Sequence, residues 1–160
     1  MHLDLTKCCY RRHTNFAIES IEQVFNGSAD FGKRVTCTVS RNGDLIWRVY
    51  LQVDLPAVTQ NSGGFAWTNN LGNVMIRMVE VEIGGQRIDR QYGDWMNIWN
   101  ELTIDQGKVN GYANMIGDTS DLTTGFATGS SLKNSLPAKT LYIPLFFWFC
   151  RVKNAEKSVL

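Results

Sequence analysis

The sequence predicts an all-β protein, an antiparallel β-sandwich with one short helix near residues 94–103. Three observations favour this fold class. The 160 residues include 14 glycines but only 3 prolines, together with many β-branched and aromatic residues, which is typical of strands joined by turns. Several segments alternate between apolar and polar side chains, as half-buried strands do. Hydrophobic residues form 44% and charged residues 19% of the chain, so it can build a core.

The segment before residue 31 carries little periodicity. Residues 10–16 form a basic, aromatic arm, which is either a solvated charge cluster or a contact with a neighbouring subunit. In residues 17–25 the apolar side chains fit one helical turn or an irregular strand, and both assignments stay open. Asn26-Gly27-Ser28 is a turn and also a glycosylation sequon. Because the first residues lack the apolar core of a secretory signal, we expect this sequon to stay unmodified.

A first hairpin is predicted between residues 31–40 and residues 45–53. The first of these segments alternates between apolar and hydroxyl-bearing side chains. Asn42-Gly43 between them is the strongest short signal for a hairpin turn. Pro56 stops the returning strand. Four of its side chains are expected to point inward: Trp47, Val49, Leu51 and Val53.

A second hairpin and the helix occupy residues 74–103. Residues 74–83 alternate but change phase at Met78-Val79, which predicts a β-bulge there. Gly84-Gly85 predicts a two-residue turn, after which residues 86–92 return. Asp94 is a candidate N-cap of the helix. A stripe with helical spacing is expected to face the core: Trp95, Ile98, Trp99 and Leu102.

Residues 104–139 indicate one long, exposed loop, because they consist mostly of Gly, Asn, Ser, Thr and Asp. Residues 111–118 are the one part of it with an ordered pattern. Residues 140–150 then predict a strand that is apolar on both faces. Such a strand belongs in the middle of a packed structure.

No catalytic, cofactor-binding or metal-binding residue is predicted. The chain has no nucleophile elbow, phosphate loop or zinc-helix motif. Glu80 and Glu82 share one strand face, and a glycosidase pair is one interpretation, but alternating acidic residues are common on solvated strands. His13 has no acidic neighbour in sequence. The cysteines lack metal-ligand spacing and are expected to be reduced and buried: Cys8, Cys9, Cys37 and Cys150.

Net charge, the apolar run at residues 141–150 and the tryptophans argue against nucleic acid, a membrane and sugars as binding partners. A net charge of +1 and a pI of about 7.7 argue against a nucleic-acid-binding surface. Residues 141–150 are the most apolar run, but ten residues interrupted by Pro144 are too short for a membrane-spanning helix. The tryptophans fit core packing better than stacking on sugars: Trp47, Trp67, Trp95, Trp99 and Trp148.

Four segments carry a resemblance to a known family. They are YRRHTNFAIESIEQ (10–23), FNGSADFGKRVTCTVSRNGDLIWRVYLQVDLP (25–56), VEVEIGGQRIDRQYGDWMNIWNELT (79–103) and YIPLFFWFCR (142–151). With them the chain resembles the double jelly-roll major capsid proteins of the large nucleocytoplasmic DNA viruses, the iridovirus, phycodnavirus and mimivirus-like groups. The resemblance covers most of residues 10–151, in order.

The resemblance implies a structural protein of the virion, made in the host cytoplasm and without enzymatic activity. In this family each subunit carries two eight-stranded jelly rolls, and three subunits form a pseudo-hexagonal capsomer of an icosahedral capsid. The implied partners are therefore further copies in a homotrimer and, laterally, other capsid proteins. Residues 17–151 correspond to most of the N-terminal jelly roll, with an arm at 1–16 and a divergent tail at 152–160. The tail replaces the strands expected next, which implies an incomplete jelly roll from a truncated, split or spliced gene.

An incomplete jelly roll leaves an unpaired strand edge beside residues 140–150, so we expect an isolated chain that is oligomeric or poorly soluble. Two other classes of function stay open. A carbohydrate-binding jelly-roll module requires at least two tryptophans on one exposed face, and a jelly-roll hydrolase requires two converging carboxylates. A relic that does not assemble is a further alternative.

Overall fold

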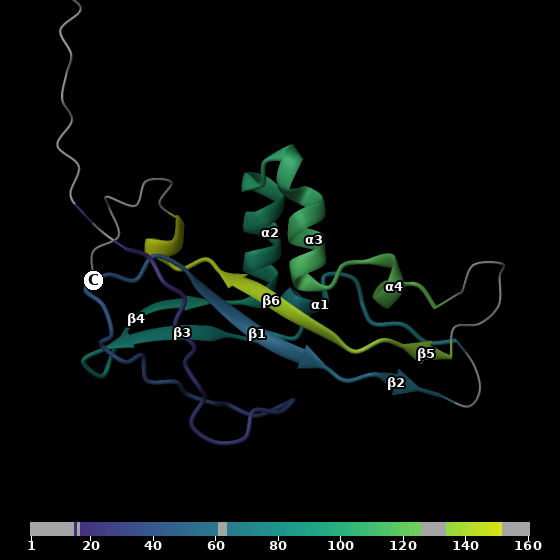
Figure 1. Ribbon diagram of the computed structural model, residues 1–160, viewed down its shortest axis with the longest axis horizontal. Coiled ribbons are helices and arrows are strands. Elements are labelled where there is room, and N and C mark those ends of the chain that lie inside the picture. Colours follow the sequence, from purple (N-terminus) through teal and green to yellow (C-terminus); the bar gives the residue numbers. More distant parts are fainter. Residues whose placement is uncertain (1–14, 16, 61–63, 126–133, 152–160) are drawn as a thin grey trace, which may run out of the picture. The chain divides into compact units, whose positions relative to one another are not determined.

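The computed structural model describes residues 15, 17–60, 64–125 and 134–151 (Figure 1). The chain divides into two compact units, Met1–Arg41 and Asn42–Leu160, and each is described by itself. The arm and tail expected at residues 1–16 and 152–160 lie, apart from residue 15, outside the described residues.

In the first unit, residues 23–26 and 36–40 lie antiparallel. The Asn26 amide donates to the Thr36 carbonyl at 2.7 Å, and the Ser40 amide and hydroxyl both donate to the Gln23 side-chain oxygen at 3.0 Å. The described residues of 17–25 form neither a helix nor a regular strand. Residues 31–40, predicted as the first strand of a hairpin, form no regular strand; within them Thr36 makes an isolated bridge to Asn26.

Among the described residues, the regular helices and strands all belong to the second unit. In chain order they are β1 (Val49–Leu55), β2 (Val58–Thr59), α1 (Leu71–Val74), β3 (Val79–Ile83), β4 (Gln86–Gln91), α2 (Gly93–Thr103), the 3-10 helix η1 (Gln106–Lys108), α3 (Val109–Ile116), α4 (Ser120–Thr123), β5 (Ser135–Leu136), β6 (Lys139–Leu145) and the 3-10 helix η2 (Trp148–Arg151). The expected antiparallel strands are present, but with this helical content the described chain is not clearly all-β.

The described residues form three two-stranded antiparallel sheets: β1 with β6, β2 with β5, and β3 with β4. The β1–β6 register runs from Val49 opposite Leu145 to Leu55 opposite Lys139. The inward and outward alternation predicted for β1 is confirmed, since Leu51 and Val53 are half-buried while the residues between them are exposed. On β6 the prediction of two apolar, covered faces is wrong, because Tyr142 is 48% exposed.

The β3–β4 hairpin confirms the glycine turn. Gly84 and Gly85 have φ of 60° and 80°, a conformation that costs glycine no steric energy. The strand begins later than expected, because Val74 ends the helix α1. The bulge predicted at residues 78–79 lies instead between Val81 and Glu82. There Val81 pairs with Asp89 but Glu82 pairs with Arg87, so the partner strand skips one residue.

Helix α2 begins and ends close to the predicted residues, but its orientation differs from the prediction. Its buried residues are Gly93, Met96 and Asn100. A Cβ on Gly93 would lie 2.1 Å from the Asn73 carbonyl oxygen, so only glycine allows α2 to approach α1 this closely. The helix therefore turns its glycine side inward. In the predicted core-facing stripe, Trp95 packs against a core cluster and Trp99 is half-buried, whereas the prediction is wrong for Ile98 and Leu102, which are exposed. Asp94 is not the N-cap; it lies in the first turn, where its carboxylate favours the positive end of the helix dipole.

The predicted loop at 104–139 is wrong in its described part, which contains η1, α3, α4 and β5. The ordered pattern at 111–118 belongs to α3 and its C-terminus. There Gly117 adopts a φ of 80° and caps the helix by donating to the Ala113 carbonyl. Tyr112 and Ile116, one turn apart, turn to the interior, and this spacing was hidden by the polar residues around it.

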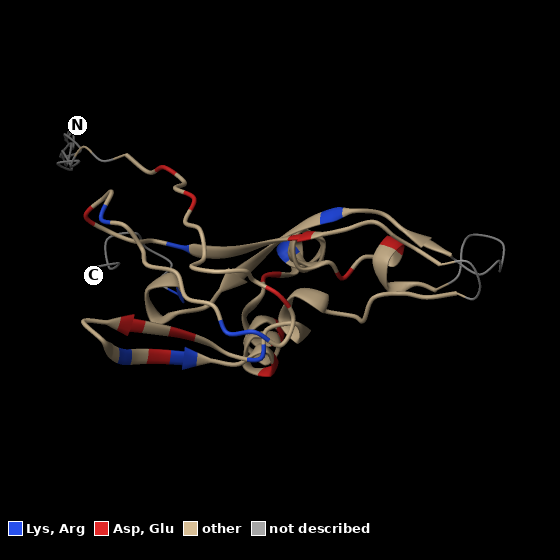
Figure 2. Cartoon of the chain, turned by 90° about the horizontal axis from the view of Figure 1, so that it is seen from below, with Lys and Arg blue, Asp and Glu red and all other residues tan. Residues whose placement is uncertain are grey.

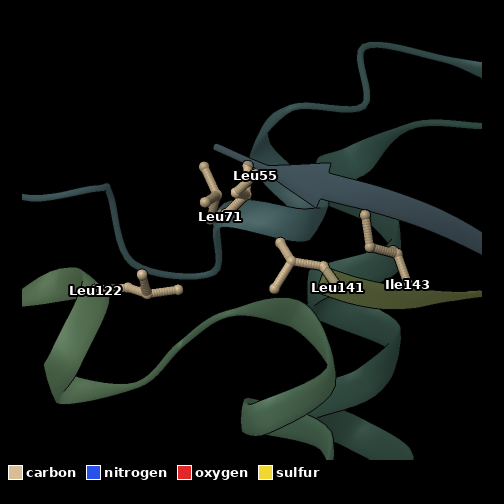
Figure 3. Packing of buried hydrophobic residues seen from close by; sticks show 5 residues of the cluster. All are labelled: Leu55, Leu71, Leu122, Leu141 and Ile143. Atoms are coloured by element: carbon tan, nitrogen blue, oxygen red, sulfur yellow. The ribbon is translucent and has the colours of Figure 1, made fainter. Parts of the chain in front are cut away.

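The core consists of two buried clusters. One joins β1, α1, α4 and β6 through five side chains, which Figure 3 shows from close by: Leu55, Leu71, Leu122, Leu141 and Ile143. The other joins α2 to the end of β6 and η2: Met96, Leu145, Phe147 and Phe149. The predicted inward positions of β6 and the residues after it are thereby confirmed. In the described part of the chain no helix has both the length and the apolar character needed to cross a bilayer.

Candidate assembly surfaces

Glu80 on β3 is held by two arginines of β4. Arg90 Nε donates to Glu80 Oε1 at 2.5 Å, and Arg87 donates to the same oxygen at 3.4 Å. The hydrogen bond to Glu80 raises the pKa of Arg90, and the side chain of Glu80 is only 10% exposed. Figure 2 shows acidic and basic residues together on this hairpin. The carboxylate is therefore part of an ion-pair network across the hairpin and does not form half of a catalytic pair with Glu82.

The tryptophans are mostly packed, as predicted. Trp67 and Trp95 contact the two core clusters, and Trp47 and Trp99 are half-buried. Trp148 is the single exposed tryptophan, at 36%, and its ring meets Phe149 edge to face. The pair of exposed indoles that a carbohydrate-binding module requires is therefore missing from the five tryptophans, all of which lie in the described part of the chain.

The cysteines show no reactive environment where they are described. Cys37 and Cys150 are free and half-buried. Burial raises the pKa of the Cys150 thiol, which lowers its thiolate fraction and its nucleophilicity. Cys8, Cys9 and His13 lie outside the described residues.

One shallow, open depression is lined by polar residues of α3, α4 and the start of β6. Two of its charged groups pair with each other: Lys139 Nζ donates to Thr119 Oγ1 at 2.9 Å and lies 3.6 Å from the Asp121 carboxylate. A third, Asp118, accepts a hydrogen bond from the Asn70 amide. The hydrogen bond from Thr119 lowers the pKa of Asp121. Among the described residues no three His, Cys, Asp or Glu side chains gather as a metal site would require.

Two kinds of surface remain for contact with other polypeptide. The first is the edge of the sheets, because each sheet has two strands and the described residues add no third strand to β1 or β6. An open edge exposes a row of backbone donors and acceptors and is a template for another strand.

The second surface is the outer side of α2, formed by Trp95, Ile98, Trp99 and Leu102 and called the α2 stripe below. Ile98 is 59% and Leu102 78% exposed. The indoles of Trp95 and Trp99 stack at 5.6 Å between ring centroids, and the Arg151 guanidinium lies over them at 5.1 and 5.3 Å. The sequence pattern assigned all four residues to the core. This is confirmed for Trp95, which packs against a core cluster, and wrong for Ile98 and Leu102, because periodicity alone does not show which side of a helix is covered.

Comparison with known proteins matches most of the chain. A family model described as "Major capsid protein N-terminus" matches residues 5–159. The chain is 52% identical over 165 residues to the major capsid protein of Phaeocystis pouchetii virus, covering 91% of this chain and 32% of that protein. It is 43% identical over 155 residues to capsid protein 1 of Acanthamoeba polyphaga mimivirus, covering 91% of this chain and 26% of that protein.

Among solved structures, the chain is similar to PBCV-1 VP54, as fitted into a reconstruction of the virophage Sputnik. The TM-score is 0.71 and the identity 34%, over 96% of this chain and 33% of that one. A quasi-atomic model of the PBCV-1 virus capsid matches with a TM-score of 0.66 at the same identity. The chain thus spans between about a quarter and a third of the length of these relatives.

Proposed function

The chain belongs to the family of major capsid protein N-termini, and from this premise we propose that it is the N-terminal part of a shell-building subunit of a large DNA virus. The single observation that carries the proposal is the match of 91% of the chain, at 52% identity, to the major capsid protein of Phaeocystis pouchetii virus. The proposed place of action is the virion, and the proposed role is structural, without turnover of a substrate.

The physical character of the described residues supports a structural role. Buried apolar side chains join strands to helices in both core clusters. The candidate acid Glu80 is neutralised by arginines, and Lys139 in the polar depression is paired with Asp121. A net charge of +1 allows copies to pack side by side without the repulsion that strongly charged subunits experience.

We further propose that the described antiparallel sheets belong to a viral jelly roll formed mainly by residues 17–151. In a jelly roll two antiparallel sheets pack face to face and the strands are fully paired except at short edges. Here β1 and β6 form a sheet of two strands only. The portion of the longer relatives outside the match supplies the strands that complete the roll, and three completed subunits form a pseudo-hexagonal capsomer of an icosahedral shell.

The experiment is a chimera in which this chain replaces the matched third of the Phaeocystis pouchetii virus protein. Its mass is measured by light scattering coupled to size exclusion, and its particles are viewed by electron microscopy. The proposal predicts a species with the mass of three subunits and a pseudo-hexagonal outline. A folded chimera that stays monomeric under conditions in which the unmodified viral protein forms trimers would contradict it.

A further inference from the structure

We propose that the α2 stripe is a docking surface for the C-terminal portion that the longer relatives carry beyond the matched region. This inference rests on the proposed function, because it assigns to that portion a specific contact with the described residues. It concerns one face of one helix and is independent of which strands complete the sheets.

The first step is the orientation of α2. Gly93 holds the inner side of the helix against α1, since any side chain there would collide with the Asn73 and Ile76 carbonyl oxygens. Met96 is fully buried on the same side. The helix cannot rotate to bury its stripe without losing this close approach, so Ile98 and Leu102 remain outside in the described part of the chain.

The second step is the composition of the stripe. An exposed amphipathic face with large apolar residues at helical spacing is uncommon on a surface that stays in water. Tryptophan and arginine are enriched at the energetic centres of protein interfaces. Trp95, which packs against a core cluster, and the half-buried Trp99 stack on each other under the Arg151 guanidinium and fix one side of the stripe. Beside them Ile98 and Leu102 supply the exposed apolar contact area.

The third step identifies the occupant. Arg151 belongs to η2, the last described element, and it rests on the stripe itself. Any polypeptide that follows η2 therefore leaves from beside this stripe. The match is to the N-terminal part of the family and covers 32% of the Phaeocystis pouchetii virus protein, so a large C-terminal portion follows the matched region in that relative. The matched region ends at residue 159, eight residues after Arg151, so this portion is tethered by a short segment to the stripe on which Arg151 rests, which gives it a high effective concentration there.

Charge argues against two other occupants. Helix α2 carries Asp94 and Glu101 and no lysine or arginine. Helices that lie on membrane surfaces are usually rich in basic residues, which attract anionic lipids. A second copy packing stripe against stripe would bring the acidic residues of both helices near one another, which costs energy in a desolvated interface.

The test compares the 160-residue chain with the chimera described above by hydroxyl-radical footprinting read by mass spectrometry. Oxidation of Ile98 and Leu102 is expected to fall at least tenfold in the chimera. Ile83 and Ile88 of the β3–β4 hairpin, which are 47% and 51% exposed, serve as matched controls and are expected to change less than twofold. A chimera that forms trimers but oxidises Leu102 as fast as the short chain does would overturn the inference and leave the proposed function intact.

Two double variants, each made in both the short chain and the chimera, separate docking from an effect on folding. In the short chain, I98D/L102D and the control I83D/I88D are expected to shift Tm equally little, because both pairs are solvent-exposed. In the chimera, I98D/L102D is expected to restore fast oxidation of Trp99, whereas I83D/I88D leaves it protected. If I98D/L102D lowered the Tm of the short chain much more than I83D/I88D does, the short chain itself would cover the stripe. If the stripe of the short chain were protected from oxidation and lost this protection on dilution, a second copy would cover it. Either result would overturn the inference.

A third arm removes the covalent link. The short chain carrying an affinity tag is co-expressed with the remaining portion of the Phaeocystis pouchetii virus protein. The inference predicts that the two co-purify and that I98D/L102D lowers the recovered partner at least tenfold. Recovery that is unaffected by I98D/L102D, or absent with the unmodified chain, would overturn it.

Discussion

The substitution Gly93→Ala tests how tightly α2 is set against α1. The added methyl group would lie 2.1 Å from the Asn73 carbonyl oxygen and 2.5 Å from that of Ile76. Both are backbone atoms, so no side chain can rotate away and the helices must separate. Overpacking in a well-packed interior costs typically 1–3 kcal/mol, and a gain of up to about 1 kcal/mol in helix propensity offsets part of it. We expect a net loss of about 2 kcal/mol in the free energy of unfolding.

The assay is denaturant unfolding followed by tryptophan fluorescence and by far-ultraviolet circular dichroism. A loss of about 2 kcal/mol corresponds to a fall in Tm of roughly 4–8 °C for a chain of this size. Gly111 in α3 is the matched control, because a Cβ there meets nothing within 4 Å. Gly111→Ala is expected to stabilise the chain by about 0.5–1 kcal/mol. If Gly93→Ala were as stable as Gly111→Ala, the reasoning about the α1–α2 contact would be refuted.

Three further predictions concern other parts of the second unit. Leu141 is fully buried on β6, so Leu141→Ala is expected to cost about 2–5 kcal/mol in chemical unfolding, whereas the same change at the exposed Tyr142 should cost less than a third as much. Tyr112 donates to Asn73 Oδ1 or accepts from its Nδ2, and burial raises the pKa of Tyr112. The stability that this raised pKa represents is present below about pH 10 and is lost as the pH rises through the higher pKa of Tyr112 in the folded state. Tyr112→Phe should therefore flatten the alkaline part of a plot of Tm against pH. An unchanged curve would contradict the assignment. Glu80→Gln is expected to weaken the salt dependence of the unfolding midpoint, because it removes the acceptor charge of the hairpin network, and an identical salt slope in both proteins would count against that network.

Local sequence signals predicted the elements whose causes are local. The glycine pair at residues 84–85 gave the hairpin turn because its positive φ values need glycine, and the alternation in β1 gave the buried side of that strand. The partner of β1 was not predictable in this way. Its pairing with β6 joins residues such as Val49 and Leu145, and alternation specifies a face without specifying which distant strand lies beside it.

The errors have similar physical reasons. Helix α3 was hidden because it is short, contains Gly and Asn, and lies within a segment that is mostly Gly, Asn, Ser, Thr and Asp. The composition of that segment favoured a loop, whereas packing against β6 and α1 stabilises the helix. For the candidate surface, periodicity identified the α2 stripe, but the steric demand of Gly93 decided which side of the helix is covered. A glycine at the first turn of an amphipathic helix was the one sequence signal that could have shown this.

The central claim is that these residues build part of a capsid shell subunit. The most direct measurement is a cryo-electron microscopy map of the chimera at a resolution that separates strands. The account predicts that β1 and β6 lie within a larger antiparallel sheet whose added strands come from the C-terminal portion, in a trimer with a pseudo-hexagonal outline. A map of a folded particle in which β1 and β6 remain an isolated pair with open edges would contradict it.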